Sequence, residues 1–381
     1  MNICLVNSYY PPWVGGAESY VKNLANALTY RGHEVTVYCS EKPLKAGINF
    51  DDKIKVVRMH TPLLIYGTPL VLFPPSIIVE DFHIIHANFP SPYLASVSSF
   101  AGEVARTPSV LTWHNDLPPV TSGAGLLVKV HNSIAPAYLR NFDRIIATTP
   151  AYAKSSEILR RFSSKVSVVM NGVDTKRFSP EVRGDRIRNM YNLEGCKIVL
   201  FVGALTTFHS YKGVDVLIRA FSSVSKKFRD SRLVVVGAGN MLSSFKKLAS
   251  GLGVSEAVVF PGYVDDNLLP EFYAACDVSV LPSKNSSEGF GLVLIEAMAC
   301  GKAVIGSRTG GIVDVIKDGK NGILVEPGDQ LELASAIAYL FENPDKRVTM
   351  GNAGREFAEL LDWSKTAERV EAIYNQVQPR R

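Results

Sequence analysis

The chain has 381 residues, of which 46% are hydrophobic and 20% charged, and its formal net charge is +5. This length exceeds what one ordinary hydrophobic core supports, so we expect two globular domains. All of the excess charge lies in residues 1–180, which hold 17 Lys and Arg against 12 Asp and Glu. That bias is compatible with phosphates or anionic lipid, but it is too weak to indicate nucleic-acid binding.

The sequence shows no sign of a membrane span, a signal peptide or a metal centre. No stretch reaches the ~18 apolar residues needed to cross a bilayer, and the nearest candidate, residues 62–79, is broken by prolines. Residues 1–6 form an apolar run with no basic region before it, which predicts a strand. The five cysteines show no disulfide or metal spacing and no Asp-x-Asp pair occurs, so we expect a reducing cytoplasmic location and no metal requirement.

Short apolar runs alternate with helical patterns along the first half, which is typical of parallel βαβ units. A strand is expected at residues 2–6 and a helix at residues 17–30, where apolar residues recur with helical spacing. Further strands are expected at residues 35–38, 84–86, 109–112 and 145–147.

The same alternation restarts at residue 197. Near-continuous Val, Ile and Leu runs indicate a sheet covered on both faces. A helix is expected at residues 214–228. Strands are expected at residues 198–203, 233–237, 258–260, 278–281 and 303–305.

These patterns predict an α/β fold with two Rossmann-like, doubly wound domains that face each other across a cleft. We place the first domain at residues 1–180 and the second at residues 181–362. The last helix, within residues 363–381, is expected to pack back onto the first domain. Ligands of such sheets bind at the carboxyl ends of the strands, so the cleft is the expected site.

A glycine-rich loop follows the first strand. Gly15 and Gly16 would let a ligand approach the backbone at a helix N-terminus, which suits a phosphate or a polar sugar group. The plainer alternative is a loop whose glycines serve only the turn.

Other candidates follow later strands. His114 could hydrogen-bond the transferred group or move a proton, although a structural histidine is the plainer interpretation. Lys212 precedes a helix and could contact a phosphate, although a lone lysine is usually solvated. The Gly-Ala-Gly-Asn run at residues 237–240 lacks the third glycine of a dinucleotide fingerprint and is interpreted as a turn.

The most informative stretch begins at Glu288 and ends at Glu296. The two glutamates enclose a glycine-rich helix start, which consists of Gly289, Phe290, Gly291 and Leu292. The N-terminal N–H groups of a buried helix need partners, and a diphosphate would supply them. Glu296 could then accept both hydroxyls of a ribose, and Glu288 could accept hydroxyls of a sugar.

Two alternatives apply to the paired glutamates. They could be the acid and base of a glycosidase, but such carboxyls lie roughly 5–10 Å apart, whereas eight helical residues span roughly 12 Å. They could also be structural, with Glu288 capping the helix and Glu296 pairing with a basic residue. The spacing favours two roles on one long ligand.

Together these motifs resemble the retaining, GT-B-fold glycosyltransferases of family 4, also called glycosyl transferases group 1. The resemblance covers nearly the whole chain, and its strongest part is the E-x7-E pattern from Glu288 to Glu296. Its other parts are Gly15-Gly16, Asn171-Gly172-Val173-Asp174, Phe178-Ser179-Pro180, Lys212-Gly213, residues 260–264, Thr309-Gly310-Gly311 and Asn321-Gly322.

The resemblance implies transfer of a sugar from a nucleotide-diphosphate sugar to a hydroxyl of a glycan or lipid-linked acceptor, with no metal. GDP-mannose, UDP-glucose and UDP-GlcNAc all remain open as donors. It implies three catalytic roles: Glu288 holds donor-sugar hydroxyls, Lys212 neutralises the departing diphosphate, and His114 lies near the sugar. It also implies that Glu296 binds the ribose.

The resemblance assigns further donor contacts to the backbone. Gly15 and Gly16 would face the donor phosphate and sugar. Tyr263 and Val264 would meet the base. The acceptor's proton would pass to the leaving phosphate on the same face of the sugar, and positive charge on that phosphate would supply much of the rate.

One position departs from the family pattern. An arginine usually follows the glycine at Gly203, but here the residue is Ala204. The loss of a charge-assisted contact in a dry site can cost roughly 10²–10³ in rate. Either a nearby group such as His209 substitutes, or activity is low. A non-catalytic sugar-nucleotide-binding protein, an epimerase or a phosphorylase on the same architecture therefore remains an alternative.

The acceptor side is less well defined. Residues 126–131, with Arg140 downstream, and residues 63–79 could form surfaces for peripheral contact with the cytoplasmic face of a membrane. The alternative is that both are ordinary core and loop.

Overall fold

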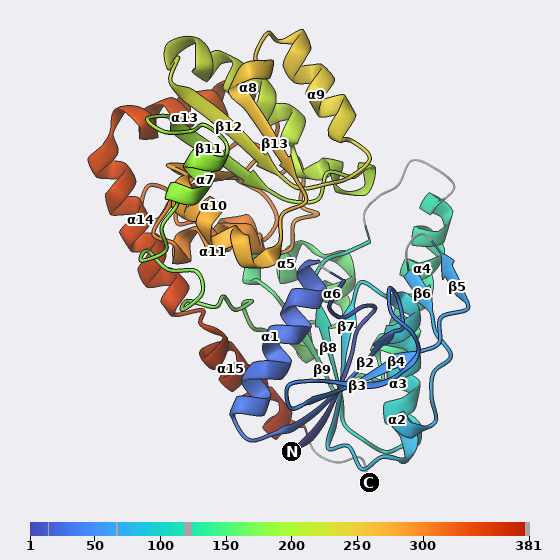
Figure 1. Cartoon of the computed structure of the whole chain (residues 1–381). Helices are drawn as coiled ribbons and strands as arrows, with labels where there is room; N and C mark the ends of the chain where they lie inside the picture. Colours follow the sequence, from blue (N-terminus) through green and yellow to red (C-terminus); the bar gives the residue numbers. More distant parts are fainter. Residues whose placement is uncertain (14, 66–67, 118–123, 378–381) are drawn as a thin grey trace. The chain divides into compact units, whose positions relative to one another are not determined.

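The structure is a computed structural model that describes residues 1–13, 15–65, 68–117 and 124–377, with the backbone alone for residues 124–128. The chain divides into two compact units, Met1–Gly172 with Trp363–Arg381, and Val173–Asp362 (Figure 1). The sequence placed the boundary at residue 180, whereas the structure divides the chain at residue 172. Residues 173–180 are held in the second unit by backbone contacts such as Val173 N to Leu361 O at 2.9 Å.

The first unit is built on one large sheet, with eight strands among the described residues in the order β10-β9-β8-β7-β1-β2-β4-β3. Neighbouring strands are parallel except for β3, which pairs antiparallel with β4. The strands are β1 (Asn2–Val6), β2 (Glu34–Ser40), β3 (Gly47–Asp51), β4 (Ile54–Met59), β7 (Ile84–Phe89), β8 (Ser109–Trp113), β9 (Arg144–Ala147) and β10 (Val166–Val168). A separate antiparallel hairpin joins β5 (Leu63–Ile65) and β6 (Thr68–Leu70).

Helices cover both faces of this sheet. On one face α1 (Gly16–Tyr30) and α15 (Trp363–Gln376) share a core with β1 and β2, and the two helices lie side by side in Figure 1. The other face carries α2 (Ser76–Val79), α3 (Pro92–Val104), α4 (Ala124–Leu139), α5 (Pro150–Ser155) and α6 (Glu157–Arg161). The C-terminal helix is therefore part of the first unit.

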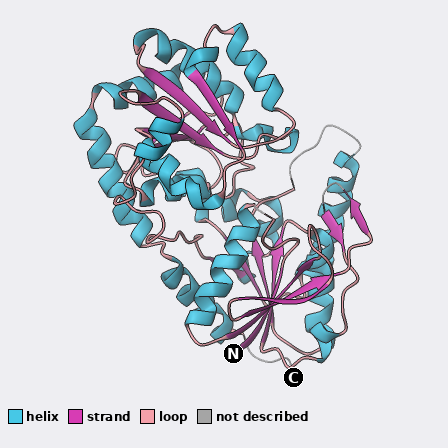
Figure 2. Cartoon of the chain, in the orientation of Figure 1, coloured by secondary structure: helices cyan, strands magenta, loops and turns pink. Residues whose placement is uncertain are grey.

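The second unit, all of whose residues are described, has a six-stranded parallel sheet in the order β13-β12-β11-β14-β15-β16. Figure 2 shows its strands in magenta with helices around them. The strands are β11 (Lys197–Val202), β12 (Ser231–Val236), β13 (Val258–Gly262), β14 (Val278–Leu281), β15 (Ala303–Ser307) and β16 (Ile323–Val325). The helices are α7 (Asp185–Met190), α8 (Val214–Lys227), α9 (Leu242–Gly251), α10 (Leu269–Ala275), α11 (Leu292–Ala299), α12 (Ile312–Val315), α13 (Gln330–Glu342) and α14 (Pro344–Glu359).

This strand order fixes where a ligand can bind. In chain order the sheet of the second unit reads 3-2-1-4-5-6, so the connections reverse direction between β11 and β14. In open α/β sheets, ligands bind outside the carboxyl ends of the two strands at which the order reverses. In the first unit the reversal lies between β1 and β7. The prediction of two Rossmann-like sheets is confirmed, and each strand predicted from the sequence overlaps a strand of the structure.

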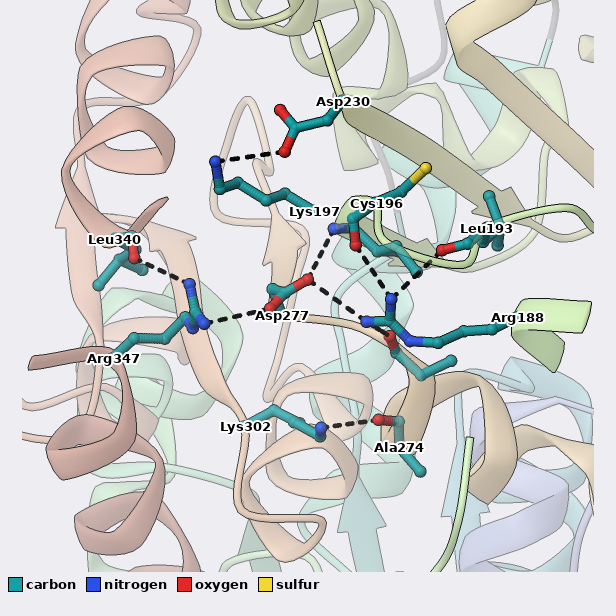
Figure 3. Close-up of polar contacts among 12 residues, drawn as sticks. Arg188, Leu193, Cys196, Lys197, Asp230, Ala274, Asp277, Lys302, Leu340 and Arg347 are labelled. Carbon is teal, nitrogen blue, oxygen red and sulfur yellow. Dashed lines mark hydrogen bonds and ion pairs between the residues drawn. The ribbon is translucent and has the colours of Figure 1, made fainter. Parts of the chain in front are cut away.

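A carboxylate organises the opposite, amino end of the second sheet (Figure 3). Asp277 Oδ2 accepts a hydrogen bond from Ile198 N at 2.8 Å and lies 3.5 Å from Arg188 Nη2, while Oδ1 lies 3.2 Å from Arg347 Nη2. Arg188 also donates to the carbonyls of Leu193, Cys196 and Ala275. Asp277 therefore ties α7 and α14 to the first residues of β11 and β14.

We expect Asp277→Ala to lower the free energy of unfolding by roughly 2–4 kcal/mol, because two guanidinium groups and one N–H lose their acceptor. Asp230→Ala is the matched control. Asp230 pairs with Lys197 at 3.4 Å, but its side chain is 51% exposed against 18% for Asp277, so its loss should cost less than about 1 kcal/mol. Chemical unfolding measures both variants, and equal losses would contradict this role for Asp277.

Candidate active site

An ion pair joins the loops that follow β11 and β14. Lys212 ends the 3₁₀ helix η2 (Thr207–Lys212) that follows β11, and Glu288 lies in the loop between β14 and α11. Lys212 Nζ is 2.6 Å from Glu288 Oε2, and the two side chains are only 15% and 12% exposed. The structure thus brings together two residues that the sequence identified separately.

The charge of Lys212 depends on this partner. Burial lowers the pKa of Lys212, but the charge of Glu288, the neighbouring Tyr211 and the hydrogen bond to Glu288 more than offset burial, so the pKa lies above its ordinary value. Lys212 is therefore a partly buried cation at neutral pH. A buried cation with a mobile side chain can exchange one anionic partner for another.

Two glycines hold the loops of the ion pair in place. Gly213 has φ +74°, and a Cβ there would overlap with the Pro282 carbonyl at the end of β14. Gly310 has φ +54°, and a Cβ there would overlap with the Glu288 carbonyl, which also accepts a hydrogen bond from Gly311 N at 2.9 Å. Any larger residue at either position would push Lys212 or Glu288 out of place.

The N-terminus of α11 opens beside Glu288. The N-cap is Gly291, with φ +84°, and among the described residues no side chain caps the first turn. The helix behind it is apolar and largely buried, as is Phe290. The first-turn N–H groups of Leu292 and Val293 are therefore positioned for an anion that is not part of the chain. Gly289 lies in the loop between Glu288 and this turn.

Glu296 lies one turn further along α11. Its Oε2 accepts a hydrogen bond from the Tyr273 hydroxyl at 2.7 Å, so its hydrogen-bond partner is a phenol and not the basic residue of the structural alternative. Burial raises the pKa of Glu296 to about 7, although the Tyr273 hydrogen bond and Arg177 act in the opposite direction. Arg177 is itself paired with Asp266 at 2.8 Å. Ionisation of Glu296 in this buried position is thus unfavourable, and hydrogen bonds from two ligand hydroxyls would stabilise its carboxylate.

Residue 204, where the family pattern has an arginine, is exposed in the structure. Ala204 follows β11 and carries no charge, while His209 lies one turn before Lys212. His209 Nδ1 is 2.8 Å from Thr206 Oγ1. Burial, reinforced by Lys212, lowers the pKa of His209 to about 4, so without a ligand His209 is neutral at neutral pH. The loop that carries these residues rests on the 237–240 turn, where Leu205 N donates to Ala238 O at 2.9 Å.

The two residues that the resemblance assigned to the base of the donor follow the edge strand β13. Tyr263 and Val264 directly follow this strand, and the Tyr263 side chain is exposed. They lie two strands from the ion pair in the sheet order.

In the first unit, His114 follows β8 and lies among buried aromatic and polar groups. Its Nε2 is 3.2 Å from Asn88 Oδ1, and its ring meets the Tyr20 ring edge-on at 4.6 Å. The Tyr20 ring also meets Trp363 of α15 at 5.5 Å. Burial lowers the pKa of His114 to about 3, so the imidazole is neutral at neutral pH.

The glycine loop after β1 is anchored at several points. Tyr10 donates to Asp51 Oδ2 at 2.9 Å, and Arg58 donates to the Pro11 carbonyl. Gly15 is the N-cap of α1, and a Cβ there would overlap with Glu18 Oε2. Burial raises the pKa of Glu18 to about 7. Gly16 begins the helix, while residue 14 lies outside the described residues.

Two family models match the chain. The model described as "Glycosyl transferases group 1" matches residues 185–357, and the model "Glycosyltransferase Family 4" matches residues 14–177. A curated relative, the GDP-mannose-dependent alpha-(1-6)-phosphatidylinositol monomannoside mannosyltransferase of Mycolicibacterium smegmatis, is 30% identical over 375 residues, 94% of each chain. The chain belongs to glycosyltransferase family 4. It is a glycosyltransferase that uses a nucleotide-sugar donor.

Other similar proteins support the same assignment. The O-antigen chain mannosyltransferase C of Escherichia coli is 28% identical over 93% of the glycosyltransferase described here and 92% of its own length. Sucrose-phosphate synthase from Thermosynechococcus elongatus superposes with a TM-score of 0.80 at 25% identity, covering 99% of this chain and 98% of that one. HepE of Anabaena with UDP and glucose reaches 0.79 at 22% identity, covering 99% and 100%, and shows the fold. The predicted GT-B fold class is thereby confirmed.

Several features of this glycosyltransferase bear on metals and membranes. Among the described residues, no group of three His, Cys, Asp or Glu side chains could hold a metal ion. In the same part of the chain, no helix is long and apolar enough to cross a membrane. The side chains of residues 126–128 lie outside the description.

One residue of the expected basic surface at 126–131 is not a surface residue. His131 is buried, its Nε2 is 2.8 Å from the Tyr138 hydroxyl, and its ring stacks on Phe89. Exposed apolar side chains lie in both expected surfaces, at Val130 in the first and at Leu63, Leu64 and Ile65 of β5 in the second.

Sequence reasoning missed several residues that the structure places beside the predicted site residues. Glu18 stands three positions after the N-cap Gly15, a capping-box spacing that the sequence displays. Asn88 is a polar residue inside a buried strand, which also could have been noticed. Tyr273 and Tyr20 gave no local signal, because their contacts to Glu296 and His114 join distant segments of the chain.

We expect the free energy of unfolding of the glycosyltransferase to depend on pH through the ionisation of Glu296. The folded state holds a proton on Glu296 up to about pH 7, against an ordinary pKa of 4.5, so the free energy of unfolding falls as pH rises through this window. The Glu296→Gln variant cannot ionise at this position, so this contribution to the decrease in its free energy of unfolding is absent. Relative to wild type, the variant should gain on the order of 2 kcal/mol between about pH 5 and about pH 8, allowing for partial exposure. Urea unfolding across this range measures the difference, and a pH-independent difference would contradict a raised pKa.

Proposed function

We propose that this glycosyltransferase moves a hexose from a nucleotide-diphosphate sugar to a hydroxyl of a glycan or lipid-linked acceptor, with retention and without a metal ion. The observation that carries the proposal is the Lys212–Glu288 pair, 2.6 Å apart, beside the uncapped N-terminus of α11. A cation, a helix N-terminus without a side-chain cap and a carboxylate lie together here, and they match the two phosphates and the sugar of a sugar diphosphate.

The diphosphate binds at α11 and Lys212. Its oxygens accept hydrogen bonds from the first-turn N–H groups that lack a cap, and Lys212 Nζ turns from Glu288 to the phosphate bonded to the sugar. Glu288 is thereby released to accept hydroxyls of the donor sugar. The exchange preserves the charge balance of a partly buried site, because one anionic partner of Lys212 replaces another.

Glu296 binds the ribose. Its raised pKa supports this role, since two hydroxyl donors would stabilise the ionised carboxylate next to the Tyr273 hydroxyl. Tyr263 and Val264 follow the edge strand β13 and contact the base. In the first unit, Gly15 and Gly16 contact the donor phosphate and sugar, and His114 contacts the sugar.

The reaction depends on stabilising the leaving diphosphate. As the bond between the anomeric carbon and the phosphate oxygen breaks, negative charge grows on that oxygen, where Lys212 and the α11 N–H groups are already aimed. The acceptor hydroxyl attacks on the same face, and its proton passes to the leaving phosphate oxygen. Lys212 and the helix N-terminus supply the positive charge that a divalent ion supplies in other transferases, so no metal is required.

His209 provides the contact that Ala204 lacks. In the free protein burial keeps the imidazole neutral, and a neutral imidazole can still donate one hydrogen bond to a phosphate oxygen. A bound diphosphate also raises the pKa of a neighbouring imidazole, which brings a second positive charge into the site. This assignment favours an active transferase over a non-catalytic binding protein.

GDP-mannose is the donor we favour, with a lipid-linked acceptor. The support is the Mycolicibacterium smegmatis relative, whose name gives a GDP-mannose donor and a phosphatidylinositol mannoside acceptor. Exposed Leu63, Leu64 and Ile65 on β5 suit peripheral contact of the first unit with a membrane that carries such an acceptor.

We expect Lys212→Met to lower kcat/KM by about 10²–10³, because the leaving diphosphate loses its main cation. Glu288→Gln should lower it comparably, by weakening the hold on the donor sugar. Release of nucleoside diphosphate from GDP-mannose, UDP-glucose or UDP-GlcNAc with a lipid extract measures both.

Lys284→Met is the matched control for these variants. Lys284 lies in the same β14–α11 loop but pairs with Asp215 at 3.2 Å in an exposed position, so its loss should change kcat/KM by about twofold or less. If Lys212→Met and Lys284→Met had similar values of kcat/KM, the assignment of the diphosphate site to Lys212 would be wrong.

A further inference from the structure

The orientation of the Asn88 amide is fixed by a carbonyl group. Asn88 lies in β7 and is 1% exposed, and its Nδ2 donates a hydrogen bond to Val6 O at 3.2 Å. A backbone carbonyl can only accept, so the Asn88 atom that faces Val6 must be the amino group. The opposite atom, which faces His114, is therefore the carbonyl oxygen Oδ1.

This amide in turn fixes the proton of His114. Asn88 Oδ1 lies 3.2 Å from His114 Nε2 and can only accept a hydrogen bond. Nε2 must therefore carry the proton. Because burial lowers the pKa of His114 to about 3, the ring holds a single proton at neutral pH. Nδ1 is left with a free lone pair.

The surroundings of the ring add no competing charge. Tyr20 from α1 meets the ring edge-on, and its hydroxyl lies 3.3 Å from Thr112 Oγ1. Thr112 Oγ1 lies 2.7 Å from Nε2 of His86. Burial raises the pKa of Tyr20 to about 12 and lowers that of His86 to about 3, so both are neutral. Within the described residues, Nδ1 of His114 has no hydrogen-bond partner.

We propose that Asn88 is a positioning residue that holds His114 as the Nε2–H tautomer, so that Nδ1 accepts a hydrogen bond from a hydroxyl of the bound sugar. The inference rests on the proposed contact between His114 and the sugar, and it adds the direction of that contact. His114 would therefore recognise a sugar hydroxyl that donates a hydrogen bond to Nδ1. A sugar analogue with fluorine or a keto group there, which cannot donate, should be rejected because it leaves the Nδ1 lone pair unpaired.

The tautomer is tested in the free protein by ¹⁵N NMR with labelled histidine, using His114→Gln to assign the signals. The spectrum should show a protonated Nε2 and an unprotonated Nδ1 for His114 in wild type, and a mixture of tautomers in Asn88→Ala. Thr112→Val is the matched control, because it removes buried hydrogen bonds of the same strand cluster but leaves the Asn88 contact. It should keep the wild-type tautomer. A proton on Nδ1 in wild type, or an unchanged tautomer in Asn88→Ala, would overturn the inference.

Activity tests the consequence for the reaction. Asn88→Ala should lower kcat/KM by about 10- to 100-fold, by analogy with the loss seen when the hydrogen-bond partner that orients a metal-bound histidine is removed. Asn88→Asp keeps an acceptor opposite Nε2, but its carboxylate raises the pKa of His114. As pH falls below that pKa, Nδ1 gains a proton and becomes a donor, so activity should fall at a pH where wild type is still active.

The outcomes separate this inference from the proposed function. If wild type and Asn88→Ala turned over equally while Lys212→Met was impaired, the role of Asn88 would be overturned and the transferase assignment would stand. If neither wild type nor any variant released nucleoside diphosphate while the NMR showed the Nε2–H tautomer, the proposed function would fail and the assignment of the tautomer would hold.

Discussion

The ion pair between Lys212 and Glu288 is the constraint on which the second unit is arranged. It joins the loops after β11 and β14, the two strands at which the sheet order reverses. Gly213 and Gly310 are required because their backbones approach the neighbouring loops too closely for a side chain. The uncapped start of α11 lies beside the pair. The fold thus keeps a largely buried cation beside a helix N-terminus that no described side chain caps, and the attraction between charges is stronger where water is largely excluded.

The first unit uses neutral groups where the second uses charges. His114, Tyr20 and His86 are all uncharged at neutral pH because they are buried. Their hydrogen bonds and ring contacts extend from β7 and β8 to α15, through the 2.6 Å contact between His86 Nδ1 and the Tyr374 hydroxyl. A neutral, hydrogen-bonded cluster suits the recognition of sugar hydroxyls, whereas a charged pair suits a diphosphate.

Local patterns in the sequence predicted the buried elements well. β1 was predicted as a short apolar run, and α1 was predicted because its apolar residues recur with helical spacing. β3 was missed because its side chains are almost all exposed, so no alternation marks it. The motifs also identified Lys212 and Glu288, but their direct contact depends on strand order, which periodicity does not encode. The Asn88 amide was missed for the same reason, since its orientation depends on Val6, 82 residues away.

The sugar diphosphate is proposed to bind at the Lys212–Glu288 pair. A crystal structure of the protein with a bound nucleoside diphosphate tests it most directly. The account predicts that Lys212 Nζ leaves Glu288, now 2.6 Å away, and contacts the terminal phosphate, while the other phosphate oxygens accept hydrogen bonds from the first turn of α11. A nucleoside diphosphate bound elsewhere, with the Lys212–Glu288 pair intact, would contradict the account.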